Sequence, residues 1–202
     1  MRKPLANTKG FLLLWPETKT MRTLLLPALM ILVSFASCSL PSATGPYGTS
    51  FSTPIEYNDY IIARQTSIIN HILDISKTAQ TDLQATEALL NQGVKLADSA
   101  LLDVKGLPAF NGDSTFRNRA ISMFHFYRQV FDVDYREMVA IRKKGDHITV
   151  EDVQRLDAIQ ARLTEEETER DKHFQNAQQE FAERNNLRLR TNEIQEKIDE
   201  AN

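Results

Sequence analysis

The sequence predicts an all-α fold, an antiparallel up-down four-helix bundle with a long last helix. Helix breakers are scarce, because only one proline and four glycines follow Pro54. Apolar residues recur at three- and four-residue intervals through four successive segments, which is the helical period. The connections between these segments are short, and short connections make successive helices antiparallel neighbours.

The first helix is expected from Pro54 to about residue 77. Thr53 can serve as its N-cap, and a proline suits the first helical position. Isoleucine favours strands, but the isoleucines of this segment follow the helical period: Ile55, Ile61, Ile62, Ile68, Ile69, Ile72 and Ile75. Periodicity therefore outweighs propensity here.

The second helix is expected to start at a capping box formed by Thr81 and Gln84. Its apolar face consists of Leu83, Leu90, Val94, Ala97, Leu101 and Val104. Gly93 inside it costs about 1 kcal/mol relative to alanine, which points to a close approach of another helix. Residues 105–114 combine glycine, proline, asparagine and aspartate, and so predict a loop.

The third helix is expected to be capped by Asp113 or Ser114 and to end in basic residues before Gly145. Its apolar positions are Phe116, Ala120, Phe124, Tyr127, Phe131, Met138 and Ile141. Aromatic residues are frequent along this helix, and Phe124, Phe126, Tyr127, Phe131 and Tyr135 are expected to be core, with the lining of an apolar pocket as the alternative.

The fourth helix is expected to open with a capping box of Thr149 and Asp152 and to continue to Asn185–Asn186. It would be about 50 Å long. Its apolar positions are Val150, Val153, Leu156, Ile159, Leu163, Phe174, Ala177 and Phe181. Residues 187–202 form a polar C-terminal tail, and no strand pattern competes with the helices after residue 38.

The segment before the helices has the pattern of an export signal. An uncharged apolar run at residues 23–36 follows Met21 and Arg22, and Pro27 interrupts it. The run is too short for a comfortable membrane span, which needs roughly 20 apolar residues. Residues 1–37 are therefore interpreted as a signal-peptide region, with Met21 as the more natural start.

Cys38 is the only cysteine in the chain, and it ends the segment Phe35-Ala36-Ser37-Cys38. This segment resembles the bacterial lipobox, from which Phe35 departs because an aliphatic residue is usual there. The resemblance implies a lipid-modified Cys38, with a fortuitous free cysteine as the alternative. Residues 38–53 would then be the lipidated cysteine and a flexible tether, rich in Ser, Pro, Gly and Thr, and residues 54–186 the bundle.

The net negative charge of the chain argues against nucleic acid as a partner. Removal of residues 1–37 takes away five basic residues and one acidic residue, which changes the formal net charge from −3 to −7. An acidic chain repels nucleic acid. No cysteine remains for a disulfide, so stability must come from packing.

Three pieces of sequence together resemble a known group of proteins. They are Tyr57–Ile61 followed by Gln65, the loop at residues 106–113 leading into Phe116, and the ending from Glu166 to Ala182. This pattern is similar to a family of uncharacterised small helical lipoproteins of Bacteroidota and spirochaetes, some labelled leptospiral-type surface proteins. The resemblance covers roughly residues 55–186 and implies a lipid-anchored helical domain without an established activity.

No catalytic constellation is found. The four histidines lack a glutamate three residues before them, so the paired motifs of a di-iron bundle are absent from the sequence. Glu169 and His173 are one turn apart and are interpreted as a solvated pair rather than a metal site. No metal, cofactor or enzymatic activity is expected.

The best candidate site consists of polar residues that lie on the otherwise apolar faces of two predicted helices. Asn58 and Gln65 lie on the isoleucine face of the first helix, and Glu166 (or Glu167) and Arg170 lie between Leu163 and Phe174 on the fourth. If these faces meet, a polar cluster lies inside the bundle. It would either fix helix register as a hydrogen-bonded network or form a pocket for a polar ligand.

The sequence thus predicts a lipid-anchored cell-envelope protein without enzymatic activity, acting as an interaction or structural module. The alternative is a periplasmic carrier or sensor that binds a small ligand inside the bundle. The expected partners are the membrane, reached through Cys38, and another envelope protein. The lipobox resemblance implies the periplasmic face of the outer membrane, with the cell surface as the alternative.

Overall fold

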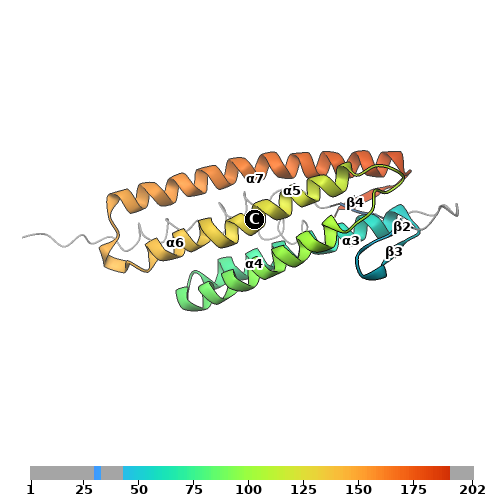
Figure 1. The fold of residues 1–202 in the computed structure, drawn as a ribbon. Coiled ribbons are helices and arrows are strands. Elements are labelled where there is room, and N and C mark those ends of the chain that lie inside the picture. Colours follow the sequence, from blue (N-terminus) through green and yellow to red (C-terminus); the bar gives the residue numbers. More distant parts are fainter. Residues whose placement is uncertain (1–29, 33–42, 192–202) are drawn as a thin grey trace, which may run out of the picture.

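The computed structural model describes residues 30–32 and 43–191, and this part of the chain is all-α in character. Helical segments run side by side along one long axis (Figure 1). They are α3 (Pro54–Thr78), α4 (Leu83–Lys105), α5 (Thr115–Gln129), the π-helical segment η2 (Val130–Asp134), α6 (Tyr135–Arg142) and α7 (Val150–Arg184). The predicted helical class and the long last helix are confirmed.

Short strands and turns accompany the helices. β1 (Met30–Leu32) pairs antiparallel with β4 (Leu189–Thr191), and β2 (Ala43–Thr44) pairs with β3 (Ser50–Phe51). One 3-10 turn, η1 (Pro46–Gly48), joins β2 to β3, and another, η3 (Gly145–His147), precedes α7. The expectation of no strand after residue 38 was wrong at β2, β3 and β4, because ladders of two or three residues are too short to produce a period in the sequence.

The predicted tether contains an aromatic anchor. Phe51 is buried, and its ring packs edge-on against Tyr57 at 5.4 Å and Tyr60 at 5.2 Å between centroids. The expectation of a flexible tether up to residue 53 was therefore wrong for its last part. Composition averages over a segment, and one buried aromatic ring is enough to attach such a segment to a core.

Capping side chains define the starts of the helices. Thr53 caps α3 and Thr149 caps α7, as predicted; both form a reciprocal capping box with the residue three positions later, which was expected from the sequence only at Thr149. At α4 the N-cap is Asp82, whose carboxylate accepts hydrogen bonds from the backbone N–H groups of Gln84 and Ala85. The predicted cap at Thr81 was wrong by one position, because aspartate caps a helix as well as threonine does.

One irregularity interrupts the third predicted helix. α5, η2 and α6 follow one another without a break, and η2 contributes one π-helical turn where a uniform α-helix is expected from the sequence. The extra residue of a π-turn rotates the following side chains around the helix axis. As a result, the adjacent residues Asp134 and Tyr135 are both buried.

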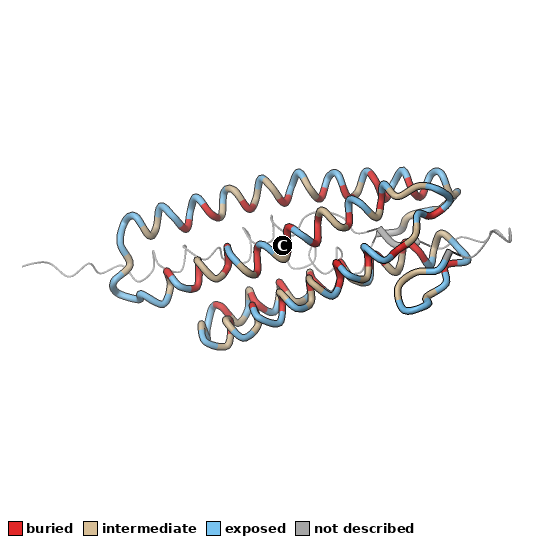
Figure 2. The backbone as a smooth tube through the Cα atoms, in the orientation of Figure 1, coloured by how far each residue is buried: buried red, intermediate tan, exposed pale blue. Residues whose placement is uncertain are grey.

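The core lies along the facing sides of the helices (Figure 2). Every member of the predicted aromatic series of the third helix is buried, so the core interpretation is confirmed. The end of the domain where α3 starts and α7 ends is densely aromatic: Tyr57, Phe110, Phe116 and Phe181 pack with centroids 5.2–5.6 Å apart. Val150, one of the apolar positions of the fourth predicted helix, is exposed because it lies in the first turn of α7.

Gly93 marks a close helix contact, as its position predicts. It is buried in α4, and a Cβ atom there would lie 2.9 Å from Cγ of Phe131 and 3.0 Å from its Cδ atoms. We expect Gly93→Val to lower the free energy of unfolding by about 2 kcal/mol, because the buried ring cannot move without disturbing its neighbours. Urea unfolding measures the effect. Gln92→Val, at the exposed neighbouring position, is the control, and an equal loss in both variants would contradict the contact.

No helix in the described part of the chain is long and apolar enough to cross a membrane. The predicted export signal and Cys38 lie outside the described residues, apart from the three residues of β1.

Candidate functional site

The structure separates the predicted polar cluster into two groups. Asn58 and Gln65 on α3 are in the interior, with exposed fractions of 0% and 2%. Glu166 and Arg170 on α7 are at the edge, where their side chains are 32% and 38% exposed. The two groups do not form one cluster.

Two other acidic residues of α7 take the interior positions. Glu167 and Asp171, one turn apart, are 8% and 6% exposed. The stripe of Leu156, Ile159 and Leu163 continues through them to Phe174. Of the two glutamates that the sequence offered for the interior, Glu167 is the buried one, whereas the interior assignment of Glu166 and Arg170 was wrong by one position along the helix. Glu167 and Asp171 follow Leu163 at successive four-residue intervals, which is the helical spacing of the buried stripe. This spacing is the sequence signal that identifies them.

A hydrogen bond fixes the register between α3 and α7. Nε2 of Gln178 donates to Oδ1 of Asn58 at 2.9 Å, and both residues are buried. The neighbouring rings of Tyr57 and Phe181 stack with their centroids 5.6 Å apart. The sequence did not single out Gln178. Its amide pairs with Asn58, so this part of the interior acts as a register lock between two helices.

The second part of the interior is acidic and lies two turns further along α3. α3 and α7 run in opposite directions (Figure 1). Gln65 lies seven residues after Asn58 on α3, and Asp171 lies seven residues before Gln178 on α7, so both are two turns from the Asn58–Gln178 hydrogen bond in the same direction. Tyr127 of α5 contributes its hydroxyl to the same place, where it hydrogen-bonds with Gln65 and is within electrostatic range of Glu167 and Asp171. Tyr135 of α6 interacts with Glu167. We call Gln65, Tyr127, Tyr135, Glu167 and Asp171 the acidic cluster.

Burial dominates the electrostatics of the acidic cluster. It raises the pKa of Asp171 to about 7, although a hydrogen bond from Nε2 of Gln175 at 2.6 Å opposes the shift. Burial, and then the nearby Asp171, raise the pKa of Glu167 well above its usual range. Among the described residues, no Lys, Arg or His forms an ion pair with either carboxyl group. The two acids are therefore buried without a compensating cation.

The tyrosines of the acidic cluster stay protonated. Burial raises the pKa of the Tyr127 hydroxyl well above its usual value, and Glu167 and Asp171 raise it further. Burial likewise raises the pKa of Tyr135, with additional effects of Glu167 and Asp134. Both hydroxyls can thus donate hydrogen bonds to carboxylate oxygens. Oε1 of Gln65 is buried and has no hydrogen-bond partner among the described residues.

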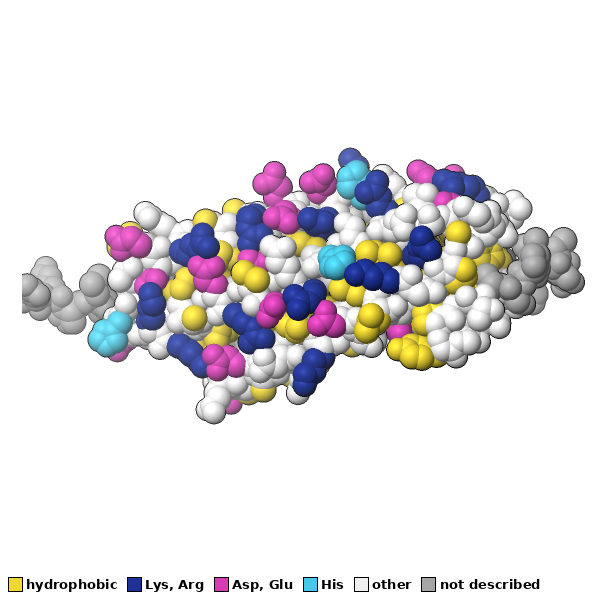
Figure 3. Space-filling view, viewed as in Figure 1, with side chains coloured by type: hydrophobic (Ala, Val, Ile, Leu, Met, Phe, Trp, Pro, Cys, Tyr) yellow, Lys and Arg dark blue, Asp and Glu magenta, His cyan; other side chains and the backbone are white. Residues whose placement is uncertain are grey.

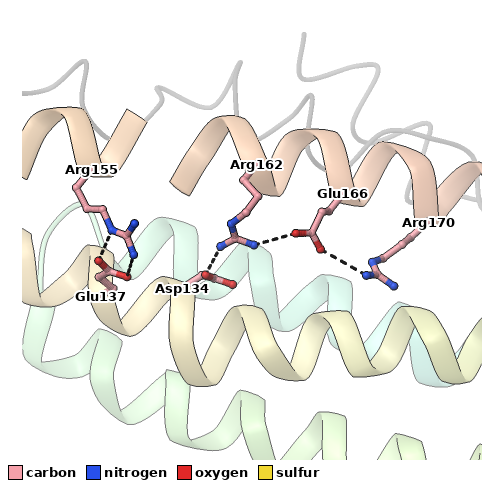
Figure 4. A network of polar contacts seen from close by, with 6 residues as sticks. All are labelled: Asp134, Glu137, Arg155, Arg162, Glu166 and Arg170. Atoms are coloured by element: carbon pink, nitrogen blue, oxygen red, sulfur yellow. Dashed lines mark hydrogen bonds and ion pairs between the residues drawn. The ribbon is translucent and has the colours of Figure 1, made fainter. Parts of the chain in front are cut away.

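A separate network of ion pairs lies along the edge between α7 and the η2–α6 segment (Figure 4). Arg155 binds both carboxylate oxygens of Glu137, at 2.6 and 3.0 Å. Arg162 bridges Asp134 and Glu166, and Arg170 continues the series from Glu166 to Ser122. Burial raises the pKa of Asp134, while Arg162 opposes the shift. Because Arg162 pairs with Asp134, Asp134 differs from the uncompensated acids of the acidic cluster.

The visible surface carries mixed charges. Basic and acidic side chains alternate over the face in Figure 3 rather than forming one large patch. Arg128, for example, pairs with Asp98 at 2.7 Å and with Asp132 at 3.2 Å. Exposed pairs of this kind contribute little to stability, typically about 0–1 kcal/mol each.

Metal-binding side chains do not gather in groups of three in the part of the chain that the structure describes. Within residues 30–32 and 43–191, no three His, Cys, Asp or Glu side chains are placed to hold a metal ion together. Glu169 and His173 are 3.7 Å apart on the exposed side of α7. This arrangement agrees with the solvated pair expected from the sequence.

No family model, curated protein or solved structure matches the chain. The resemblance to helical lipoproteins therefore stays a prediction.

Proposed function

We propose that this protein is a lipid-anchored module of the cell envelope without enzymatic activity, which binds another envelope protein or has a structural role. In this proposal its helices form an antiparallel up-down four-helix bundle. The register lock between α3 and α7 and the short connections between successive helices support that arrangement. The lipid on Cys38 would hold the bundle at the periplasmic face of the outer membrane or at the cell surface.

The filled core carries the proposal. The aromatic series that could have lined an apolar pocket is buried and packed, with Phe131 and Tyr135 6.4 Å apart between ring centroids and Phe126 and Tyr127 5.7 Å apart. Rings at such distances fill the space that an apolar ligand would need. The interior therefore supports a rigid module better than a carrier of apolar molecules.

The acidic cluster favours a second candidate, a carrier or sensor of a small polar ligand. Glu167 and Asp171 lack an ion-pair partner in the described part of the chain, and Oε1 of Gln65 lacks a hydrogen-bond partner. Buried charges without a counter-charge and buried polar atoms without a hydrogen bond are costly, so a bound ligand that satisfies them would stabilise the domain.

We expect Cys38→Ser to move the protein from the membrane fraction to the soluble fraction. A serine has no thiol with which the lipid could form a thioether. In the described region, the helices contribute no membrane-spanning segment of their own. Fractionation of the producing cells, combined with metabolic labelling by a tagged fatty acid, measures both location and lipid.

Ser37→Ala is the matched control, because it keeps a small residue next to Cys38 and should leave labelling intact. A Cys38→Ser variant that stays in the membrane fraction, or a wild-type chain that takes up no fatty acid, would overturn the anchor. Loss of the folded domain in both variants would be visible by circular dichroism.

A further inference from the structure

We propose that the acidic cluster is a binding site for a divalent cation with a preference for oxygen ligands, of the Ca²⁺ class, held by Glu167, Asp171 and Oε1 of Gln65. This inference goes beyond the proposed role as an envelope module, and neither depends on the other. Three observations support it: the charge of the site, the chemistry of its donor atoms and the orphaned amide oxygen.

The charge of the site matches one divalent ion. Glu167 and Asp171 are both more than nine-tenths buried and lie one turn apart on α7. The described residues provide neither with an ion pair to a basic side chain. Two carboxylates carry two negative charges, and a single divalent cation neutralises them without leaving net charge in the interior. A monovalent ion would leave one charge unbalanced.

The donor atoms are all oxygens. Two carboxylates and one amide carbonyl are the ligands that Ca²⁺ takes in proteins, whereas Zn²⁺ and copper favour nitrogen and sulfur. Tyr127 of α5 and Tyr135 of α6 are both within electrostatic range of Glu167, so their hydroxyls are near enough to orient its carboxylate. Hydrogen bonds to ligating carboxylates orient them and strengthen metal binding.

Gln65 supplies the observation that is independent of the acids. It is 2% exposed, and its buried Oε1 atom has no hydrogen-bond partner within residues 30–32 and 43–191. Its side chain lies beside Tyr127, which in turn interacts with both carboxyl groups. A buried amide oxygen is costly to leave unpaired. A cation between Gln65 and the two acids would satisfy this oxygen.

The site should bind weakly. It has only two charged ligands, so water must complete the coordination, and both acids keep a small exposed fraction through which water can enter. Sites with few charged ligands bind Ca²⁺ with dissociation constants of about 0.1–1 mM. Mg²⁺ should bind less well, because it holds its water shell and requires near-octahedral geometry.

Thermal unfolding of the full chain in detergent, after removal of metal with EDTA, tests the proposal. Addition of 10 mM CaCl₂ (~30 times the expected dissociation constant) should raise the unfolding midpoint by about 5 °C. The double variant Glu167→Gln, Asp171→Asn should lose this rise. It removes buried charge and keeps side-chain shape, so it is expected to fold. Gln65→Leu should reduce the rise by removing the amide ligand.

The control is Asp157→Asn with Glu165→Gln, which removes two exposed carboxylates from the same helix and should leave the Ca²⁺ effect unchanged. Terbium luminescence excited through tyrosine gives a direct second measurement, because Tyr127 lies beside the site. Absence of both a Ca²⁺-dependent shift and tyrosine-sensitised luminescence in the wild-type chain would overturn the proposal. So would an undiminished shift in the interior double variant, which would place any bound Ca²⁺ on the surface.

Discussion

The double variant Glu167→Gln, Asp171→Asn is expected to be more stable than the wild-type chain by about 2 kcal/mol at pH 8 in metal-free buffer. Both carboxyl groups are buried, and the described residues form no ion pair between them and a basic side chain. Ionising a carboxyl group in such a place is unfavourable, because it loses the hydration that it has in the unfolded chain. Neutral amides of the same shape avoid this cost.

The sign of the pH dependence follows from the direction of the pKa shifts. In the folded chain the pKa of Asp171 is raised from 3.8 to about 7, and that of Glu167 is raised above 4.5. The unfolded chain therefore ionises these groups first. Their favourable contribution is fully present below about pH 4 and is lost as the pH rises through about 7. Wild-type stability should accordingly fall between about pH 4 and about 7 relative to the double variant.

Urea unfolding at several pH values, with EDTA present, gives the difference directly. The exposed pair Asp157→Asn, Glu165→Gln serves as the reference for a change of surface charge alone. If the interior double variant were less stable than wild type at every pH, the two carboxylates would have to contribute stabilising contacts that outweigh their burial, and the picture of an uncompensated pair would be incorrect.

Phe181→Ala is expected to lower the free energy of unfolding by about 3–5 kcal/mol. The ring is buried and has three aromatic neighbours: Tyr57 at 5.6 Å, Phe110 at 5.6 Å and Phe116 at 5.5 Å between centroids. These neighbours come from three separate segments of the chain. Removing the ring therefore leaves a cavity where α3, the loop before α5 and α7 meet.

Denaturant unfolding by circular dichroism measures this loss, with Leu102→Ala as the control. Leu102 is a large apolar residue of α4 that is exposed, and its truncation should change stability by no more than about 0.5 kcal/mol. A similarly small effect for Phe181→Ala would show that the aromatic end of the domain is not part of the cooperative core.

Periodicity and capping chemistry explain why the helices could be predicted so closely. The first and last helices begin at the predicted threonine caps, and α7 ends where Asn186 takes a left-handed conformation with φ 55°. These features are local, since a cap or a helix stop depends on a few neighbouring residues. The cap of α4 was misplaced because Thr81 and Asp82 are adjacent and both can cap.

The candidate site was predicted less well, because it depends on which side of each helix faces the interior and on tertiary contacts. Asn58 and Gln65 were recognised, since polar residues on an isoleucine stripe are conspicuous. On α7, an uninterrupted run of three glutamates hides which one faces inward, and an error of one residue rotates the side chain by about 100°. The π-turn that buries Asp134 beside Tyr135 leaves no recognised pattern in the sequence.

The presence of two uncompensated carboxyl groups inside the domain is tested most directly by a carboxyl-carbon NMR titration of the metal-free chain. The resonance of Asp171 should change with a midpoint near pH 7, and that of Glu167 should titrate above the ordinary range of glutamate. Midpoints near the ordinary values of 3.8 for Asp171 and 4.5 for Glu167 would mean that both groups are solvated or paired, and would contradict the acidic cluster as described.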